Sequence, residues 1–230
     1  MVKTLGVIGG MGPQATVDFF QKVLDNTKAS RDQDHIHVII DSNPKTPDRT
    51  EAILGVGESP LKTLVNSAVK LQLMGADLLA MPCNTAHYFY DDIVKFIDIP
   101  FINMIDEVSA TIRARDPKAT RAGLLATKGV YSMGLYSRYL QKYGIEAVIP
   151  PEEGKEIVGE TIYTIKKDIN LVDPTGINRV INEMKSKGVD TIILGCTELP
   201  LIVDKYPEGV EYIDSTLVLA KRAVELVASK

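Results

Sequence analysis

Cys83 and Cys196 are the residues of this 230-residue chain whose type and placement best suit chemistry, and no other cysteine accompanies them. Each follows an apolar run typical of a buried β-strand and precedes a segment with helical periodicity. In parallel α/β sheets, ligands bind beyond the carboxyl ends of the strands. We therefore expect both thiols at such an edge, where a helix N-terminus would lower the thiol pKa toward neutrality.

The two cysteines occupy the same position of an internal repeat. Residues 75–84 (GADLLAMPCN) align without gaps on residues 188–197 (GVDTIILGCT). At similar offsets, residues 5–9 resemble 122–126, and residues 101–103 resemble 212–214. The repeat predicts two related α/β halves. We expect the first to span 1–104, completed by a C-terminal helix over 215–230, and the second to span 105–214.

Short apolar runs alternate with longer amphipathic segments along the whole chain, a pattern that predicts βαβ units and mostly parallel sheets. Asp214 and Ser215 suit the start of the last helix, because short polar side chains accept bonds from free backbone N–H groups. The predicted strands are 4–9, 36–41, 77–82, 99–103, 121–126, 146–149, 189–195 and 210–213. The predicted helices are 14–28, 61–74, 85–97, 131–143, 174–187 and 215–229.

Two equivalent thiols facing each other across a pseudo-twofold axis suit racemisation. Inverting a tetrahedral carbon requires a proton acceptor on one face and a donor on the other, with the roles exchanged in the reverse reaction. One alternative is that the cysteines are buried as small apolar side chains. Another is a redox pair, although thiols at disulfide distance would leave no room for a substrate.

Composition narrows the function classes. The formal net charge is −4, and no clustered Lys/Arg stripe suits a nucleic-acid partner. No apolar run reaches the roughly 18 to 20 residues of a membrane span, so we expect a cytoplasmic protein. His35 and His37 alternate on a predicted strand, but we expect no metal there, because paired strand histidines need none. The glycines near the N-terminus lack the Gly-x-Gly-x-x-Gly spacing of a phosphate loop.

Four segments carry a resemblance to a known family. They are LGVIGGMGP at residues 5–13 with Ala15-Thr16, PDRT at 47–50, MPCNTAH at 81–87 and LGCTEL at 194–199. Together they resemble the aspartate racemase branch of the aspartate/glutamate racemase family. The resemblance covers nearly the whole chain. It implies two similar α/β domains with the active site between them, catalysis by Cys83 and Cys196 without pyridoxal phosphate or metal, and a homodimer.

The resemblance also implies roles for other residues. Met11 and Gly12 would lie in the first substrate loop, and Asn84, Thr85 and Thr197 would hold the α-carboxylate and the amine. Arg49 would pair with the distal carboxylate through its planar guanidinium. Lys167 would be a second ligand of that carboxylate, or Lys166 if the register slips by one residue. The other implied site residues are Thr127 as a binding residue and Glu198 near a thiol or the ammonium group. At Val130 the sequence departs from the family pattern, since many relatives carry threonine there.

The sequence allows more than one interpretation of His87, of two loop segments and of the reaction. His87 lies about one helical turn beyond Cys83 and either tunes that thiol or packs in the core. Segments 43–60 and 150–158, rich in Pro, Gly and charge, are expected to close over the substrate. Maleate isomerases also use two cysteines, whereas arylmalonate decarboxylases typically keep one. A non-catalytic dicarboxylate-binding protein is a third alternative. The sequence does not distinguish aspartate from glutamate or a broader amino-acid set.

Overall fold

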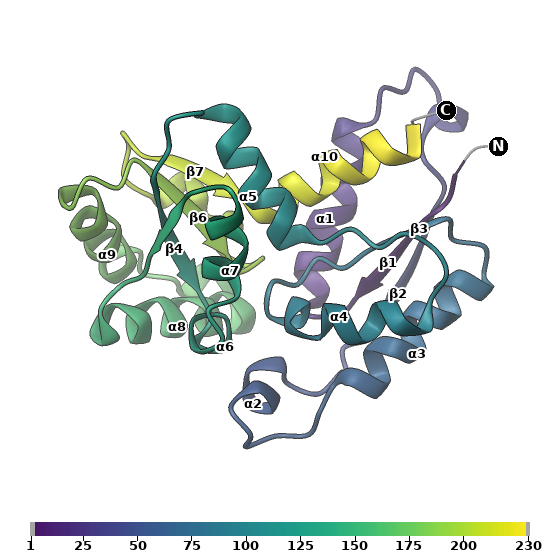
Figure 1. Ribbon diagram of the computed structural model, residues 1–230, viewed down its shortest axis with the longest axis horizontal. Helices are drawn as coiled ribbons and strands as arrows, with labels where there is room; N and C mark the ends of the chain where they lie inside the picture. The colour runs from purple at the N-terminus through teal and green to yellow at the C-terminus, as the bar shows by residue number, and fades with distance from the viewer. Residues whose placement is uncertain (1–2, 229–230) are drawn as a thin grey trace.

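The computed structural model describes residues 3–228 and contains two parallel β-sheets, one in each half of the repeat (Figure 1). The first has the strand order β2-β1-β3, from β1 (Leu5–Gly9), β2 (Val38–Ser42) and β3 (Leu78–Ala80). The second has the order β5-β4-β6-β7, from β4 (Arg121–Ala126), β5 (Glu146–Val148), β6 (Thr191–Gly195) and β7 (Glu211–Asp214). Every neighbouring pair is parallel, which confirms the predicted fold class.

The register of the strands reproduces the internal repeat. Gly6 of β1 pairs with Leu79 of β3, and the aligned Gly123 of β4 pairs with Ile192 of β6. Both glycines are tightly enclosed, because a Cβ on Gly6 would lie 2.7 Å from Leu79 and one on Gly123 would lie 3.0 Å from Ile192. Residues aligned in the sequence therefore occupy equivalent places in the two sheets.

The strand predicted at residues 99–103, beside β3 in the first sheet, does not form as a continuous strand. Residues 99–103 were expected to form a strand like β7, but only Phe101 makes an isolated parallel bridge to Leu79. The aligned Tyr212 pairs with Ile192 within a continuous strand. Pro100 accounts for part of the difference, since a proline cannot donate to a strand ladder.

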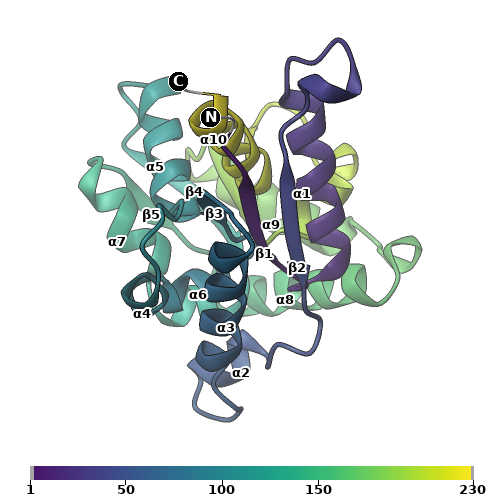
Figure 2. The same cartoon turned by 90° about the vertical axis from the view of Figure 1, so that its right-hand side faces the viewer.

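The helices connect the strands and cover the sheets (Figures 1 and 2). The first half contains α1 (Pro13–Asn26), α2 (Arg49–Ile53), α3 (Leu61–Leu73) and α4 (Tyr90–Ile93). They are followed along the chain by α5 (Met104–Arg115), α6 (Lys128–Ser132), α7 (Leu135–Lys142), α8 (Glu152–Lys167), α9 (Thr175–Ser186) and α10 (Ser215–Ala228). Shorter 3₁₀ segments span Asp32–Asp34, Thr85–Phe89, Val94–Phe96, Ile169–Leu171 and Leu199–Lys205.

One apolar core is shared by both sheets. Leu5 and Val7 of β1 belong to the same buried cluster as Leu124 of β4 and Ile193 of β6. α5 and α10 lie between the sheets in Figure 1 and contribute buried residues to this cluster. The outer faces have separate cores, one against α3 in the first half and one against α8 and α9 in the second. The two halves are thus joined by a shared apolar core as well as by the covalent chain.

Several helix predictions need correction. Residues 85–97 form the 3₁₀ segments and short α4 rather than one helix, and 131–143 is interrupted at Gly134, which has a φ of +55°. α5 occupies the expected boundary region, where no helix was predicted; the division at residue 104 itself stays a prediction. The expected lid at 150–158 instead begins α8, whose acidic first turn suits the helix N-terminus.

The C-terminal helix packs on the first half, beside α1 and against α5. Asp214 begins it as expected, since Oδ1 accepts hydrogen bonds from the N–H groups of Thr216 (2.8 Å) and Leu217 (3.0 Å). Positions 1–2 of the expected first half and 229–230 of the expected last helix lie outside the described residues. Across 3–228, no helix is both long and apolar enough to cross a membrane.

We expect Leu219→Ala in α10 to destabilise the protein strongly. Leu219 is fully buried in the shared core, and removing such a side chain costs about 2–5 kcal/mol. Leu73→Ala at the end of α3 is the matched control, because Leu73 is 80% exposed and its truncation should stay within about 0.5 kcal/mol. Urea unfolding measures both changes. Equal, small losses would contradict a shared core that includes α10.

Candidate active site

A pocket lies at the carboxyl ends of β1, β3, β4 and β6, between the two halves. Both cysteines line it and both are free thiols. They are buried, with 5% of Cys83 and 6% of Cys196 exposed. The other lining residues are Met11, Asp48, Arg49, Thr50, Asn84, Thr85, Thr127, Lys166, Thr197 and Glu198.

Glu198 is the hydrogen-bond partner of the second thiol. Its Oε2 accepts a bond from Cys196 Sγ at 2.9 Å and another from Thr197 Oγ1 at 3.3 Å. The glutamate is only 3% exposed, so its carboxylate is held inside the pocket. Gly12 borders it as well, because a Cβ on Gly12 would lie 3.3 Å from Glu198 Oε1.

The expected drop in thiol pKa is wrong for Cys196. Burial raises the pKa of this thiol well above its usual range, and the neighbouring Glu198 charge raises it further. Lys166 opposes this shift without cancelling it. The segment after Cys196 is also a turn followed by 3₁₀ helix rather than α-helix, so it supplies no long helix dipole. Cys196 is therefore a protonated thiol at neutral pH.

Lys166 supplies a positive charge to the pocket. Burial disfavours its charged form, but the negative charges of the ionised Cys196 thiol, of Glu198 and of the ionised Cys83 thiol outweigh burial and raise the Lys166 pKa. Lys167, the residue favoured from the sequence, is not among the pocket-lining residues. Each residue of an α-helix is rotated by about 100° from its neighbour, so one position decides which lysine faces the site.

Arg49 brings a second cation, held by the backbone. Its Nη1 donates to the carbonyl oxygens of Thr46 (3.1 Å) and Pro47 (3.0 Å). Its Nε is buried and has no hydrogen-bond partner among the described residues. An unpaired buried donor is costly, and an anionic ligand in the pocket would satisfy it.

Two threonines join the halves across the pocket. Thr85, just after Cys83, and Thr127, just after β4, are linked through their Oγ1 atoms at 2.9 Å. Thr127 Oγ1 also accepts a bond from the N–H of Val130 at the start of α6. Val130 is 1% exposed and does not line the pocket. Val130 is therefore part of the core.

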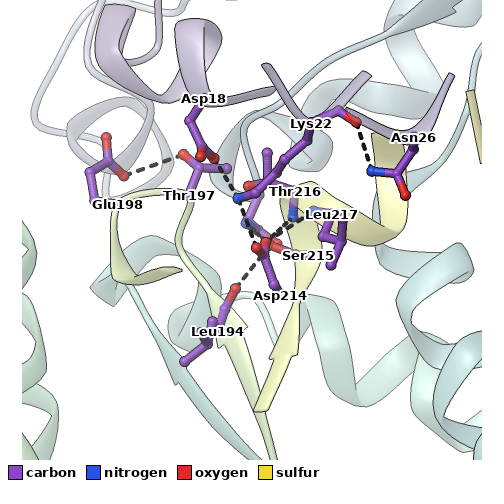
Figure 3. Close-up of polar contacts among 11 residues, drawn as sticks. Asp18, Lys22, Asn26, Leu194, Thr197, Glu198, Asp214, Ser215, Thr216 and Leu217 are labelled. Carbon is purple, nitrogen blue, oxygen red and sulfur yellow. Dashed lines mark hydrogen bonds and ion pairs between the residues drawn. The ribbon is translucent and has the colours of Figure 1, made fainter. Parts of the chain in front are cut away.

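A buried hydrogen-bond chain connects the two cysteine loops. The Tyr136 hydroxyl donates to Asn84 Oδ1 (2.6 Å), and Asn84 Nδ2 donates to Ser215 Oγ (3.0 Å). Ser215 Oγ in turn donates to the carbonyl oxygen of Leu194 (2.9 Å), as Figure 3 shows. Asn84 follows Cys83 directly, and Leu194 precedes Cys196 by two residues. The N-terminus of α10 therefore positions both loops.

An ion-pair group anchors the same end of α10. Lys22 Nζ of α1 lies 2.6 Å from Asp18 Oδ2 and 2.7 Å from Asp214 Oδ2 (Figure 3). Asp214 is the residue that caps α10, so Lys22 fixes the cap against α1. These side chains are less than one-fifth exposed, which limits screening by solvent. Ser215, the next residue, is thereby held in place.

His87 binds the backbone of the first cysteine loop rather than a thiol. The N–H of Met104 donates to His87 Nε2 at 3.1 Å, so the ring proton is on Nδ1, which donates to Cys83 O at 2.8 Å. Burial lowers the pKa of His87 to about 4. The neutral ring thus links the Cys83 loop to the start of α5. His37, which with His35 was considered for a metal site and set aside, has its Nδ1 3.1 Å from Thr4 Oγ1 in a hydrogen bond.

The structure brings together most of the predicted site residues. The sequence reasoning missed Asp48 and Thr50, although they flank Arg49 in the same short motif. It also missed Tyr136, which is fully buried and gave no sequence signal of a site. Ser215 was predicted only as a helix start, because its role depends on a contact 131 residues away.

Acidification should weaken the folded state through His87. Its pKa falls from 6.5 to about 4 on folding, so the unfolded chain binds the proton more tightly between these values. The stabilisation is complete above pH 6.5 and decreases by about 3 kcal/mol as pH falls to 4. Urea unfolding at several pH values, compared with His87→Phe, isolates this effect. The stability difference between the two proteins should shrink toward pH 4; a constant difference would contradict the assignment.

Replacing Glu198 by Gln should lower the pKa of the Cys196 thiol. The carboxylate raises that pKa through its charge and its hydrogen bond, and the amide removes the charge. Cys83→Ala provides a background in which Cys196 is the remaining thiol. The pH dependence of alkylation by iodoacetamide should move to lower pH in Cys83→Ala/Glu198→Gln. A shift in the opposite direction, or none, would refute the electrostatic role of Glu198.

Comparison with known proteins identifies the family of this chain. The family model of Asp/Glu/hydantoin racemases matches residues 8–223. The broad specificity amino-acid racemase RacX of Bacillus subtilis is 32% identical over 224 residues, 96% of each chain.

Solved structures give the same result. Picrophilus torridus aspartate racemase is 34% identical, with a TM-score of 0.87 over 99% of this chain and 95% of that one. An aspartate racemase homologue from Pyrococcus horikoshii is 29% identical, with a TM-score of 0.80 over the full length of both chains. The chain therefore belongs to the Asp/Glu/hydantoin racemase family, whose members are isomerases.

Proposed function

We propose that this protein interconverts L- and D-aspartate without a cofactor, using Cys83 and Cys196 as proton acceptor and donor on opposite faces of the α-carbon. The observation that carries the proposal is that both thiols, at matched positions of the repeat, line one pocket between the halves. The racemase relatives support the reaction class, and the aspartate racemase of Picrophilus torridus supports the substrate.

The charges in the pocket suit a dicarboxylic amino acid. Arg49 offers an unpaired Nε, and Lys166 remains protonated beside it. These two cations would bind the distal carboxylate of aspartate. Met11, Gly12, Asn84, Thr85, Thr127 and Thr197 would surround the α-carboxylate and the amine. Glu198, the buried carboxylate of the site, would attract the ammonium group while it holds the Cys196 proton.

The protonated state of Cys196 sets the proposed order of the proton transfers. Cys196 holds its proton against Glu198, so it is the donor in the first transfer, and Cys83 accepts the α-proton. In the reverse direction Cys196 must act as the base. Lys166 then stabilises the thiolate, since its charge opposes the rise in the Cys196 pKa. The carbanion formed between the transfers would be stabilised by the same cations and by exclusion of water.

The proposal includes a cytoplasmic location, expected because no apolar run is long enough for a membrane span, and a homodimer, which the family resemblance implies. It also retains movement of segment 43–60, which carries α2 and Arg49, as the way into the pocket. Neither the location nor the dimer enters the chemistry described above.

Proton exchange in D2O tests the reaction directly. The wild type should place deuterium at the α-carbon of L-aspartate and form D-aspartate with no cofactor added. Cys83→Ala and Cys196→Ala should each lower racemisation by about 10²–10⁴-fold, because each removes one acid-base group. NMR follows the exchange, and chiral chromatography follows the enantiomers.

Circular dichroism of both variants controls for folding. Undiminished racemisation by either variant would overturn the two-thiol mechanism. Exchange with L-glutamate but not L-aspartate would retain the mechanism and change the substrate. Binding of aspartate without exchange would favour a non-catalytic binding protein, and turnover of maleate alone would favour the isomerase alternative.

A further inference from the structure

A second cavity adjoins the active site. It has a volume of about 370 Å³, in the usual range for small-molecule sites. Thr50 and Thr127 line both this cavity and the active-site pocket, so the two spaces adjoin at these residues. The remaining lining residues are Lys128, Glu152, Lys155, Glu156, Gly159, Glu160, Ile162 and Tyr163.

One face of α8 runs from the active site along this cavity. Lys166 lines the active site, and Tyr163, Gly159 and Lys155 line the cavity at spacings of three or four residues along the helix. Residues at this spacing share a helix face. The cavity therefore lies next to the active site along the helix face of Lys166, the residue that would hold the distal end of a short substrate.

The cavity is suited to an aliphatic chain. Its surface is mostly carbon, with Ile162 and the half-exposed ring of Tyr163 among its residues. Gly159 leaves the helix backbone bare here, since a Cβ at this position would meet no atom within 4 Å. An unbranched chain can lie along such a groove, whereas a bulky side chain at residue 159 would fill it.

The charges at the rim are unequal. Glu152 is paired with Lys155 at 3.1 Å. Glu156 and Glu160 form no ion pair within residues 3–228, and Lys128 is the remaining cation of the rim. Two unpaired carboxylates against one lysine favour a neutral or cationic group at the far end of the cavity.

We propose that this cavity is a side-chain subsite, which extends the substrates of the enzyme to amino acids with a long unbranched aliphatic side chain that ends in a neutral or cationic group. The α-carbon stays between Cys83 and Cys196, and the side chain passes between Thr50 and Thr127 into the groove along α8. The inference depends on the racemase function proposed above. It assigns Gly159 as a specificity-determining residue that takes no part in the proton transfers.

Two linear amino acids and two substitutions of Gly159 test the subsite. L-Norleucine is the neutral probe, L-lysine the cationic probe, and L-aspartate the reference. The wild type should exchange the α-proton of norleucine and lysine in D2O. Gly159→Leu should reduce kcat/KM for both at least tenfold and leave that for aspartate within about twofold. Gly159→Ala is the matched control, since a methyl group leaves most of the cavity open.

Both substitutions should fold, because Gly159 is in the middle of a helix and either residue is a better helix former than glycine. Exchange of aspartate without exchange of norleucine or lysine overturns the subsite and leaves the racemase proposal intact. An equal loss of kcat/KM for all three substrates in Gly159→Leu also overturns the subsite. The groove would then be the route by which every substrate enters the active site. Failure of every amino acid to exchange overturns both proposals.

Discussion

The shared apolar core between the two sheets is the constraint on which the site depends. Two thiols can act on opposite faces of one carbon only if their strand ends are held in a fixed relation. Leu5 and Val7 on one sheet and Leu124 on the other are buried in one cluster with α5 and α10. The Thr85–Thr127 bond and the Asn84–Ser215–Leu194 chain then fix the loops themselves. Packing therefore sets the relative position of the two sheets, and these hydrogen bonds set the positions of the two cysteine loops.

The pocket balances its charges within a small buried volume. Glu198 is held against Cys196, and Lys166 and Arg49 are on the pocket wall. The carboxylate holds the thiol proton in place, while the lysine limits how strongly it does so. The repeat therefore places the two cysteines at equivalent strand ends, but the charges around them differ. The sequence shows this asymmetry, since Asn84 and Thr85 follow the first cysteine where Thr197 and Glu198 follow the second.

The sequence was most informative where a pattern was repeated or regular. The gapless alignment of the two cysteine segments predicted the equivalent strands, and apolar runs located most of them. The α5 helix was missed although Ile105, Val108 and Ile112 have helical spacing, because this region was assigned as the boundary between the two halves. The two prolines at 150–151 suggested a mobile segment, although they lead directly into α8.

The unpredicted parts of the site depend on three-dimensional position. Lys166 and Lys167 are adjacent on α8 and therefore point in different directions. The sequence alone does not determine which side of this helix faces the pocket. The Cys196 pKa depends on the direction of the Glu198 carboxylate and on burial. His87 and Ser215 bind backbone atoms of distant segments, so their partners have no side-chain signature. Local sequence patterns identify helices and strands, whereas contacts between distant segments are defined only by the assembled fold.

The position of α10 also affects the order in which the protein can be built. The helix packs on α1 of the first half, yet it is synthesised after both cysteine segments. Domains generally fold from the N-terminus as the chain emerges during synthesis. Here the first half lacks one of its packing partners until residue 215 and its successors have appeared. Ser215 then ties both loops at once, so the two halves of the site mature together at a late stage of synthesis.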